Sequence, residues 1–573
     1  MGIGFAAILA AGALAGVNPP GNAIVAENNQ PGADPATWLQ PAYPPTVIEG
    51  YSSEVSVLPG QTVHLHVSTA GDRYRVEVYR LGWYGGLGAR MLTCIPSCGG
   101  DEQGRRYGAE SGVFRADWPV TDTYTVPADA TSGYYYALLR DTSPGDFHDV
   151  RAWVVFIVRE PPTQHSQILV QVPVNTWQAY NPWGGKSLYT FNSTDQVHAV
   201  RVSFDRPLAY TAQGPFDAEY NLVRFLEARG YDVSYQTDVD TDEHPESLLQ
   251  HRLVIVAGHD EYWSKTMRDA FDAARDAGTN LAFTGSNAAY WQIRYEDDHR
   301  TIVGYKEYVD PEPDPALQTH LFRELVPPRP ECELMGVMHL RLRPHQSGPV
   351  DYTVTDAAAN DPWFAGTGLK PGDKILDVVG NEWDSLPDPP PPPSCVKPGM
   401  TLLFQYHGEP ADADAVRYTA PSGARVFAGG AQQLSWPLDT FNLGRFGRTL
   451  PPDTRFQQFM QNALDDLRRP APPISVLVKV RRRTATIVVR VHPDARVKEY
   501  DVYRHSGGQS FEPDASDVKL VCKTTGAACR QRRLKPGSYR FAAVAVDQWG
   551  TSYPAVSRAV LVRRRLAHPF RKR

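Results

Sequence analysis

The sequence predicts a multi-domain protein with an N-terminal β-sandwich, a central α/β domain built on a mostly parallel sheet, and a small C-terminal β-sandwich. The chain has 573 residues, which is more than a single hydrophobic core holds. Its hydrophobic content of 42% and charged content of 21% are those of an ordinary globular protein. The hydrophobic pattern changes twice, near residues 163 and 474, and these changes set the expected domain boundaries.

Residues 46–162 consist of short segments in which apolar and polar residues alternate. EVSVLPGQTVHLHVST (residues 54–69) and YRVEVYRLG (residues 74–82) show this alternation, and turn residues interrupt it often. Short strands with frequent turns indicate a β-sandwich. The preceding residues 1–45 combine an apolar, Ala-rich run typical of a signal peptide with a Pro- and Gly-rich arm.

Residues 163–470 alternate continuous apolar strands with amphipathic helices. The strand ILVQVPV precedes AEYNLVRFLEARG, which predicts a helix that stops at Gly230. After the strand LVIVA, SKTMRDAFDAARDAG predicts a helix with Ser264 as its N-cap and Gly278 at its end. NLAFTGSNAAYWQIRYE (residues 280–296) predicts a fourth strand. This alternation is typical of a mostly parallel sheet covered on both faces.

Residues 474–565 return to short alternating strands and carry much of the positive charge. Here VYR followed by YRFAAVAVD resembles a fibronectin type III module. From residue 475 to the end the chain has 22 Lys and Arg against 7 Asp and Glu, a net charge of +15. A cell-surface or other anionic partner fits this charge, and so does a solvated basic module with a basic tail at residues 566–573. The aromatic pattern of an RNA-binding sheet is not evident, so we expect no nucleic acid partner.

The six cysteines indicate disulfides. They fall into three plausible pairs, Cys94/Cys98, Cys332/Cys395 and Cys522/Cys529. The competing interpretation, a zinc site, is weaker because no CxxC pair occurs. Disulfides together with a signal-like segment favour a secreted, periplasmic or cell-surface location.

Several familiar catalytic signatures are absent from the sequence. It contains no HExxH zinc helix, no GxxxxGK[ST] phosphate loop and no GxSxG nucleophile elbow. We expect a glutamine-amidotransferase-like sheet in the central domain, yet no cysteine lies between Cys98 and Cys332 to act as a nucleophile at its edge. Catalysis on this sheet would therefore depend on carboxylates, His, Tyr or a metal.

Three polar and aromatic stretches follow predicted strands. They are NTWQAYNPWGGKSLY (residues 175–189), GHDEYW (residues 258–263) and VVGNEWD (residues 378–384). In a parallel sheet the carboxyl ends of strands meet at one rim. The rim would carry hard oxygen donors, which suit a highly charged cation such as ferric iron better than zinc: Tyr180, Tyr189, Asp260, Glu261 and Glu382. The alternative is that the aromatics only pack and that Glu261 only stabilises the dipole of the next helix.

These stretches also carry a family resemblance. VEVYRLGWYGGLGARML, NTWQAYNPWGGKSLY, EYNLVRFLEARGYDVSYQTDVD, GHDEYWSKTMRDAFDAARDAGTNLAF and GNEWD resemble the large-subunit core of N,N-dimethylformamidase. The similarity covers roughly residues 22–467. It implies an amidohydrolase that cleaves a formamide to formate and an amine, with a mononuclear ferric ion held by two tyrosines and one glutamate.

The resemblance implies a set of site residues. Carried over by motif, the metal ligands are Glu261, Tyr180 and a tyrosine of SGYYYALL, for which we expect Tyr135. Tyr134 and Tyr136 remain alternatives, and their side chains point opposite to that of Tyr135 if the segment is a strand.

The acid–base residues come from the same motifs. His259 matches the acid–base position beside the metal, and Glu382 is our candidate for a second acid–base carboxylate. A bound ferric ion would polarise the amide carbonyl and acidify water, and these two residues would relay the proton.

Two functional hypotheses follow from the sequence. The first is a metal-dependent hydrolase of a C–N amide bond in a small amide, with either a separate small subunit or a homo-oligomer as an expected assembly. The chain departs from the cytosolic family enzyme in its signal-like segment and its extra C-terminal module. The second is a noncatalytic secreted protein that binds a glycan or peptide through an aromatic rim of Trp177, Trp183, Trp263 and Trp291.

Overall fold

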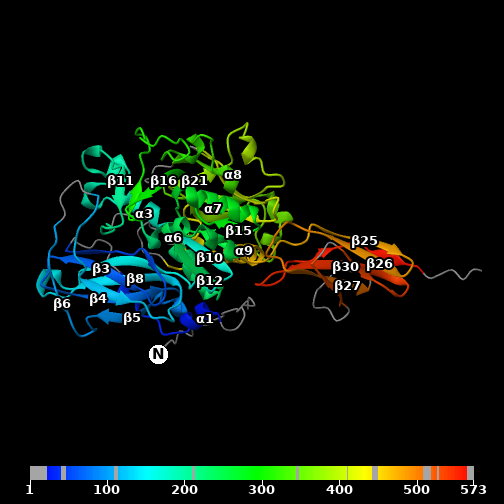
Figure 1. The fold of residues 1–573 in the computed structure, drawn as a ribbon, viewed down its shortest axis with the longest axis horizontal. Helices are drawn as coiled ribbons and strands as arrows, with labels where there is room; N and C mark the ends of the chain where they lie inside the picture. The colour runs from blue at the N-terminus through cyan, green and yellow to red at the C-terminus, as the bar shows by residue number, and fades with distance from the viewer. Residues whose placement is uncertain are drawn as a thin grey trace, which may run out of the picture.

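The computed structural model describes residues 22–39, 47–108, 114–209, 213–342, 348–408, 411–441, 450–506, 518–525 and 528–563. More of these residues lie in strands than in helices. Figure 1 shows an N-terminal sandwich, a central domain beside it, and a C-terminal module that projects from the opposite side. The expected signal segment and the basic tail lie outside the described residues. In the part that is described, no helix is long and apolar enough to span a bilayer.

Two sheets form the N-terminal sandwich. One contains β1 (Ile48–Ser52), β3 (Thr62–Thr69) and β7 (Asp122–Thr125). The other contains β2 (Ser56–Val57), β9 (Arg151–Val158), β8 (Gly133–Asp141), β4 (Arg73–Leu81) and β5 (Ala89–Ile95), with β6 (Glu102–Gln103) beside β4. Alternate residues such as Val76, Val78 and Ala137 are buried between the sheets, as the alternating sequence pattern requires.

A buried ion pair joins the sandwich to the central domain. Arg80 on β4 donates to both carboxylate oxygens of Glu227 on α5 (Tyr220–Ala228), at 2.9 and 3.0 Å. Both side chains are fully buried. The N-terminal arm, α1 (Ala23–Asn28) and α2 (Pro35–Trp38), adds to this joint, because Asn28 Nδ2 also donates to Glu227 Oε2. The two domains are therefore held together by a buried network of ionic and polar side chains.

The central sheet has nine strands. Their order is β12 (Val233–Thr237), β10 (Ile168–Val172), β13 (Leu253–Val256), β15 (Asn280–Phe283), β24 (Arg425–Ala428), β23 (Ala413–Thr419), β22 (Thr401–Tyr406), β19 (Val350–Val354) and β20 (Lys374–Val379). The strands from β12 to β24 are parallel, and those from β23 to β20 are antiparallel.

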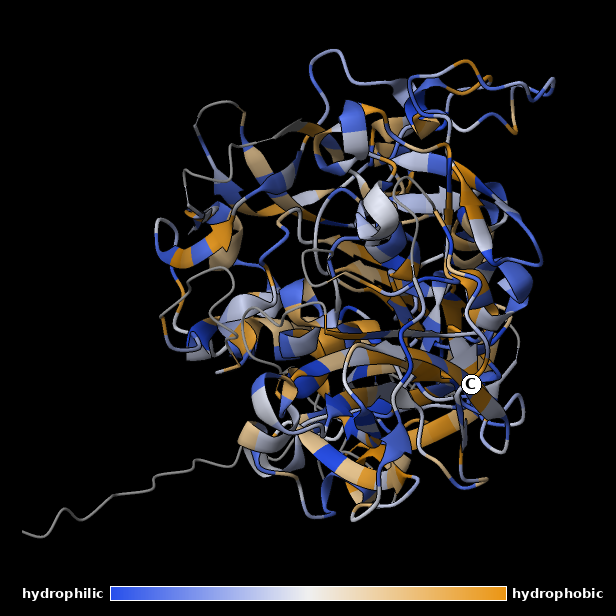
Figure 2. Cartoon of the chain, turned by 90° about the vertical axis from the view of Figure 1, so that its left-hand side faces the viewer, coloured by the Kyte–Doolittle hydropathy of each residue, from blue (hydrophilic) through white to orange (hydrophobic). Residues whose placement is uncertain are grey.

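Helices cover both faces of the parallel strands. α5 and α9 (Thr454–Leu467) pack on one face, with residues such as Ile255 of β13, and α7 (Lys265–Asp276) packs on the other, with Val254. Figure 2 shows the hydrophobic strands inside and the hydrophilic residues mostly outside. The predicted ends of both helices are confirmed: Ser264 caps α7, and Gly278 and Gly230 follow α7 and α5 with positive φ.

Two sequence predictions about strands are wrong. Residues 280–296 do not form one strand, because β15 ends at Phe283 and β16 (Trp291–Glu296) belongs to a separate sheet of β11 (Arg201–Ser203), β17 (Thr301–Val303), β16 and β14 (Tyr262–Ser264). Glu382 does not follow a parallel strand. It follows antiparallel β20 and opens β21 (Glu382–Ser385), which pairs with β18 (Met338–Leu342).

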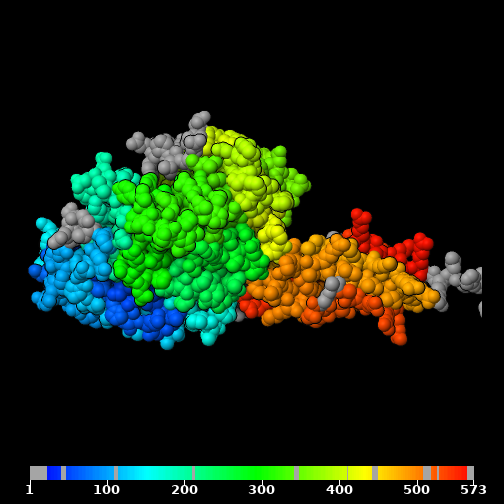
Figure 3. Space-filling model, turned by 45° about the horizontal axis from the view of Figure 1, so that its top comes forward, coloured from blue at the N-terminus to red at the C-terminus, as the bar shows by residue number. Residues whose placement is uncertain are grey.

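The C-terminal module is a second sandwich. One sheet contains β25 (Ser475–Arg481), β26 (Thr484–Arg490) and β29 (Ala528–Gln531). The other contains β28 (Lys519–Thr524), β27 (Glu499–Ser506), β30 (Gly537–Val546), β31 (Ala555–Val556) and β32 (Val560–Val562). Figure 3 shows this module extending away from the body of the protein. At its base, buried Arg252 of the central domain pairs with Asp494 at 2.6 Å and Asp547 at 2.5 Å.

All three predicted disulfides are present. They join Cys94 to Cys98, Cys332 to Cys395 and Cys522 to Cys529. The second crosses from α8 (Cys332–Met335) to the Pro-rich excursion before β22 and fixes that excursion to the central domain.

Candidate active site

The first segment of the site follows β10. Helix α3 (Val174–Tyr180) begins directly after Pro173, and its last residue is Tyr180. The side chain of Asn175 is buried and donates to the backbone oxygen of Tyr262 at 2.9 Å, which ties α3 to β14. The loop beyond α3 returns to the same place and brings Tyr189 beside Tyr180, with the ring centroids 4.2 Å apart.

The second segment is the GHDEYW loop between β13 and β14. Gly258 has a φ of 61°, and a Cβ there would lie 2.7 Å from Glu219 Oε1. A Cβ on Gly285, in the loop after β15, would lie only 1.7 Å from the backbone oxygen of Gly258. Both glycines therefore permit a close packing of loops that no other residue allows. The backbone N–H of Glu261 donates to Thr176 Oγ1 at 2.9 Å, which fixes the end of the loop against α3.

Three side-chain oxygens meet at the centre of the site. The phenol of Tyr180 donates to Glu261 Oε2 at 2.8 Å. The phenol oxygen of Tyr189 lies 2.8 Å from Glu261 Oε1 and 2.8 Å from the Tyr180 oxygen. Burial raises the pKa of both phenols well above 10, and the Glu261 carboxylate raises them further. Without a metal, both tyrosines are therefore neutral donors to one carboxylate.

A second polar group, the pair of His259 and Glu382, lies beside these oxygens. His259 Nε2 is 2.8 Å from Glu382 Oε2 and 3.4 Å from Glu261 Oε2. Burial lowers the pKa of His259, but the charge and hydrogen bond of Glu382, together with the charges of Glu261 and Glu219, outweigh burial and raise the pKa to about 9. Burial likewise disfavours ionised Glu382, yet the imidazolium holds the pKa of Glu382 at about 2. The pair is therefore an ion pair at neutral pH.

Two further residues complete the site, and the sequence analysis missed both. Asn287 Nδ2 donates to Glu382 Oε2 at 2.9 Å. Lys306 Nζ lies 3.4 Å from the centre of the Tyr189 ring and donates to Tyr262 Oη at 3.2 Å. Burial lowers the pKa of Lys306 to about 8. Neither residue follows a strand of the parallel sheet except through a loop, and no motif marks either one.

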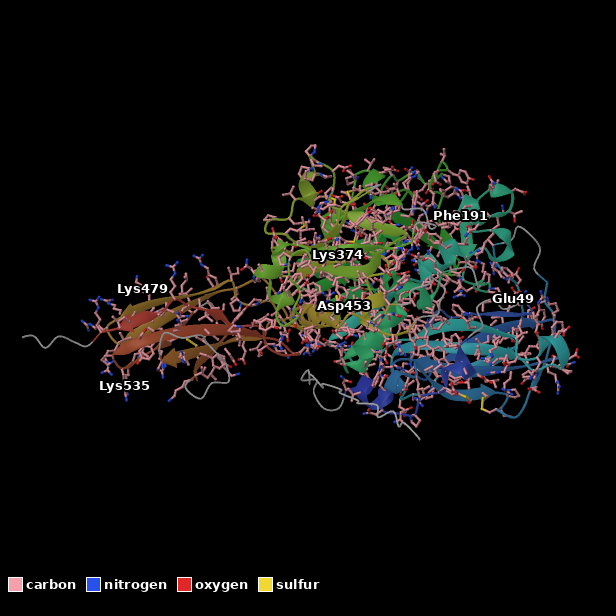
Figure 4. All side chains as sticks on the ribbon, turned by 180° about the vertical axis from the view of Figure 1, so that it is seen from behind. Glu49, Phe191, Lys374, Asp453, Lys479 and Lys535 are labelled. Atoms are coloured by element: carbon pink, nitrogen blue, oxygen red, sulfur yellow. A yellow bond between two sulfur atoms is a disulfide. The ribbon has the colours of Figure 1, made fainter. Side chains whose placement is uncertain are left out.

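The site is close to the molecular surface. Glu382 is 14% exposed, whereas the side chains of His259 and Glu261 are almost fully buried. Phe191 is 71% exposed, and its ring lies 5.2 Å from that of Tyr189 (Figure 4). Phe191 and Glu382 are therefore parts of the site that solvent reaches.

The structure brings Tyr180, His259, Glu261 and Glu382 together, but not Tyr135. The Tyr135 phenol donates to the backbone oxygen of Thr131 at 2.9 Å, and its ring packs on Phe156 in the core of the sandwich. The prediction of Tyr135 as a metal ligand is therefore wrong, because its side chain lies on the face of β8 that packs in the hydrophobic core of the sandwich.

The two alternatives to Tyr135 do not reach the site either. Tyr134 packs on Tyr235, and Tyr136 donates to the backbone oxygen of Trp38. Tyr189, which the sequence analysis placed among the rim donors, is the second tyrosine that contacts Glu261. The signal was its presence in NTWQAYNPWGGKSLY together with Tyr180.

Two other predictions for the rim are also wrong. Asp260 does not face the site, since its carboxylate accepts from Gln171 Nε2 at 2.6 Å and is fully buried. Three of the four tryptophans of the expected aromatic rim are buried, and Trp291 is partly exposed. Trp177, Trp183 and Trp263 are 4%, 6% and 0% exposed, and Trp263 packs on Phe271. Large aromatic residues here fill the core, and a ligand has no access to them.

Comparison with protein families shows which family the chain belongs to. A family model described as "N,N-dimethylformamidase beta subunit-like, C-terminal" matches residues 75–447, more than half of the chain. The chain belongs to the N,N-dimethylformamidase beta subunit-like family. The match spans every residue of the oxygen cluster and the His259–Glu382 pair. No curated protein matches the chain.

Solved structures resemble only a small part of this family member. The fourth fibronectin type III domain of a human protein is 20% identical, with a TM-score of 0.15, and the match covers 18% of this chain and 87% of that one. Domains A168–A170 of titin are 19% identical, with a TM-score of 0.15, and the match covers 17% of this chain and 33% of titin's. The twitchin kinase region of C. elegans is 16% identical, with a TM-score of 0.14, over 17% of each chain.

Proposed function

We propose that this protein is a metal-dependent hydrolase of the C–N bond of a small amide, and that its metal is a mononuclear ferric ion. The observation that carries the proposal is the convergence of Tyr180, Tyr189 and Glu261 beside the ion pair of His259 and Glu382. Membership of the N,N-dimethylformamidase beta subunit-like family supports an amide as the substrate.

The oxygen cluster fits a small, hard cation. The phenol oxygens of Tyr180 and Tyr189 and Oε2 of Glu261 are three oxygens with mutual separations of 2.8, 2.8 and 2.9 Å. Donors on one face of an octahedron around a metal, with bonds of about 2.0 Å, are separated by about 2.8 Å. Two phenols and a carboxylate are hard donors, and a strongly Lewis-acidic ion is needed to ionise phenols whose pKa burial has raised.

A different ligand set, His259, Glu261 and Glu382, also lies within 4.8 Å. His259 is poorly suited to ligation, because both of its ring nitrogens already face acceptors. Its Nδ1 is 3.0 Å from Gln213 Oε1, and its Nε2 is 2.8 Å from Glu382 Oε2. A doubly protonated imidazole has no free lone pair for a metal. We therefore assign His259 to proton transfer.

The residues of the chain supply an acid and a base for amide hydrolysis. Ferric iron, when bound, supplies a Lewis acid that polarises a carbonyl and acidifies water. Glu382, ionised and partly exposed, accepts the proton of the attacking water as the C–O bond forms. His259, held as an imidazolium, gives its proton to the nitrogen as the C–N bond breaks. Asn287 holds Glu382 in place through its Nδ2 donor.

We further infer that the central domain is of the α/β class with a glutamine-amidotransferase-like arrangement. Five parallel strands with helices on both faces support this assignment. Four polar residues of the site, Tyr180, His259, Glu261 and Asn287, follow β10, β13 and β15, at the carboxyl ends of neighbouring parallel strands. Three disulfides support an oxidising location outside the cytosol.

The test is the iron content of the purified protein, by mass spectrometry, together with its visible absorption spectrum. We expect close to one iron per chain and a tyrosinate-to-iron charge-transfer band, both reduced in Tyr180→Phe. Amine release from a panel of formamides and other small amides then tests the reaction. No iron and no band after ferric reconstitution would contradict the metal site. If the protein holds iron and shows the charge-transfer band but hydrolyses no amide, the proposed hydrolase activity would be contradicted.

A further inference from the structure

An arginine-lined hollow lies on the C-terminal module, away from the candidate active site. It is open and has a volume of about 750 Å³. Its lining consists of Val480, Arg482, Arg483, Thr484, Arg532, Arg533, Leu561 and Arg563. Five of these eight residues are arginines and none is acidic.

The arginines of the hollow gather positive charge at one place on the module. All five are exposed, and none forms an ion pair with any residue that the structure describes. Some charged residues elsewhere in the module are paired, such as Lys523 with Glu499 at 2.6 Å and Arg496 with Asp494 at 3.1 Å. Five like charges around one hollow repel each other, so an anion bound among them would relieve that repulsion.

The backbone presents these side chains from turns with unusual conformations. Arg482, in the turn between β25 and β26, has a φ of 55°, and Arg533, after β29, has a φ of 58°. Such angles are uncommon for residues with a side chain. Glycine or asparagine would adopt them at lower cost, so arginine at both positions points to a use for its side chain.

The hollow is at the end of the module that faces away from the body. β25 leaves the central domain at Ser475, so the turn at Arg482 lies at the opposite end of the strand. Lys479 and Lys535 lie in the projecting part of the module in Figure 4. The base is fixed to the central domain, since Arg496 Nη1 donates to Thr279 Oγ1 at 2.6 Å and Arg252 pairs with two acids. The hollow is thus held open to an external partner.

We propose that this hollow binds an acidic polysaccharide. Guanidinium groups bind planar carboxylates and sulfates through two parallel hydrogen bonds, and five of them match several charges along one chain. The lining has no aromatic ring on which a nucleic acid base could stack. It also lacks the Trp and Phe side chains that insert into a bilayer surface, and offers only Leu561.

The test is binding of the full chain to polygalacturonate and to dextran sulfate, measured by calorimetry, with neutral dextran as a negative control. A triple variant, Arg482→Asn, Arg532→Gln and Arg533→Asn, should weaken binding at least tenfold, and asparagine tolerates the positive φ. Arg490→Gln with Arg558→Gln removes two exposed arginines of the same module outside the hollow and should change binding less than twofold. Polygalacturonate and dextran sulfate distinguish carboxylate from sulfate recognition.

The proposal also predicts that salt weakens binding and that amide hydrolysis is unchanged in the triple variant. It would be overturned if neither polysaccharide bound, or if the control variant lost as much affinity as the triple variant. Tighter binding to single-stranded DNA or to anionic lipid vesicles than to either polysaccharide would overturn it as well.

Discussion

The phenol oxygens of Tyr180 and Tyr189 lie 2.8 Å apart, although the two residues belong to different segments, a helix end and the loop beyond it. Both hydroxyls also contact the same carboxylate, Glu261. Two buried phenols that share one carboxylate are unusual as packing, because each could be a phenylalanine at no cost in volume. Their arrangement is better explained by a ligand that needs three oxygens, and this explanation leads to the predictions below.

Tyr189 should be required for iron and Tyr135 should not. Tyr189→Phe removes one of the three converging oxygens, so we expect iron content to fall at least tenfold and the charge-transfer band to disappear. Tyr135→Phe removes a hydroxyl that binds only a backbone oxygen, at 2.9 Å, in the sandwich core. It should keep iron and band while losing about 1 kcal/mol of stability. The measurements are metal analysis, visible spectroscopy and urea unfolding of both variants.

The opposite result would reassign the site. If Tyr135→Phe lost iron and Tyr189→Phe kept it, the second ligand would have to come from the sandwich, as the sequence analysis expected. Such an outcome would require β8 to rearrange, because its tyrosines are buried in two hydrophobic clusters.

The contact between Gly258 and Gly285 should be intolerant of a side chain. A Cβ on Gly285 would lie 1.7 Å from the backbone oxygen of Gly258, so Gly285→Ala must displace the loop that carries His259 and Glu261. We expect a loss of about 2 kcal/mol or more in unfolding free energy and loss of bound iron. Gly99→Ala, at a site with no atom within 4 Å, is the matched control and should be neutral. Unchanged iron in Gly285→Ala would argue against a rigid site.

The His259–Glu382 pair should make the stability of the metal-free protein depend on pH. The pKa of His259 is raised to about 9, so its contribution is complete below about 6.5 and is lost as the pH rises through 9. The pKa of Glu382 is lowered to about 2, so its contribution is complete above about 4.5 and is lost as the pH falls through 2. Both contributions are therefore complete between about pH 4.5 and 6.5.

Glu382→Gln tests this pH dependence. We expect it to cost on the order of 3 kcal/mol at pH 6, and less at pH 10, where the wild-type imidazole is neutral. The measurement is urea unfolding of the chelator-treated proteins at both pH values. An equal deficit at pH 6 and pH 10 would show that the carboxylate acts through packing or hydrogen bonding alone.

Much of the site could be predicted from the sequence because parallel strands end at one rim. Tyr180, His259 and Glu261 follow strands β10 and β13, which are neighbours in the sheet, so strand order alone brings them together. Lys306 could not be predicted in this way, and Asn287, which follows β15, was missed because residues 280–296 were predicted as one strand. Each comes from a loop with positive φ, at 54° and 52°, whose path depends on tertiary packing rather than on a local pattern.

The wrong predictions for the tyrosines of β8 have a physical cause. The alternation of side chains along a strand shows which residues share a face, but not which face meets a ligand. SGYYYALL places tyrosines on both faces of β8, and both faces turn out to be buried in hydrophobic clusters. Glu382 was predicted as a site residue for an incorrect reason. It reaches the site from antiparallel β21, because Asn381 takes a φ of 55° and turns the chain after β20.

The last prediction concerns the joint between the central domain and the C-terminal module. Arg252 is fully buried and pairs with Asp494 and Asp547, both on the module. Arg252→Met would leave Asp547 buried without a cation and Asp494 with Arg496 alone, so we expect the joint to weaken by about 3–5 kcal/mol. Limited proteolysis should then cut faster between residues 468 and 475, while iron binding in the central domain is unchanged. Arg490→Met is the control, because it removes an arginine at an exposed position of the same module.

A second variant separates the charge effect from the loss of a contact. Arg252→Met combined with Asp494→Asn and Asp547→Asn removes the cation and both anions, so the desolvated carboxylates no longer oppose association. Replacing a whole buried ion group is often tolerated where removing one partner is not. The triple variant should therefore resist proteolysis better than Arg252→Met alone. If it is cut equally fast, the joint depends on the guanidinium's other contacts, including its position over the Trp549 ring, 5.6 Å from the ring centre.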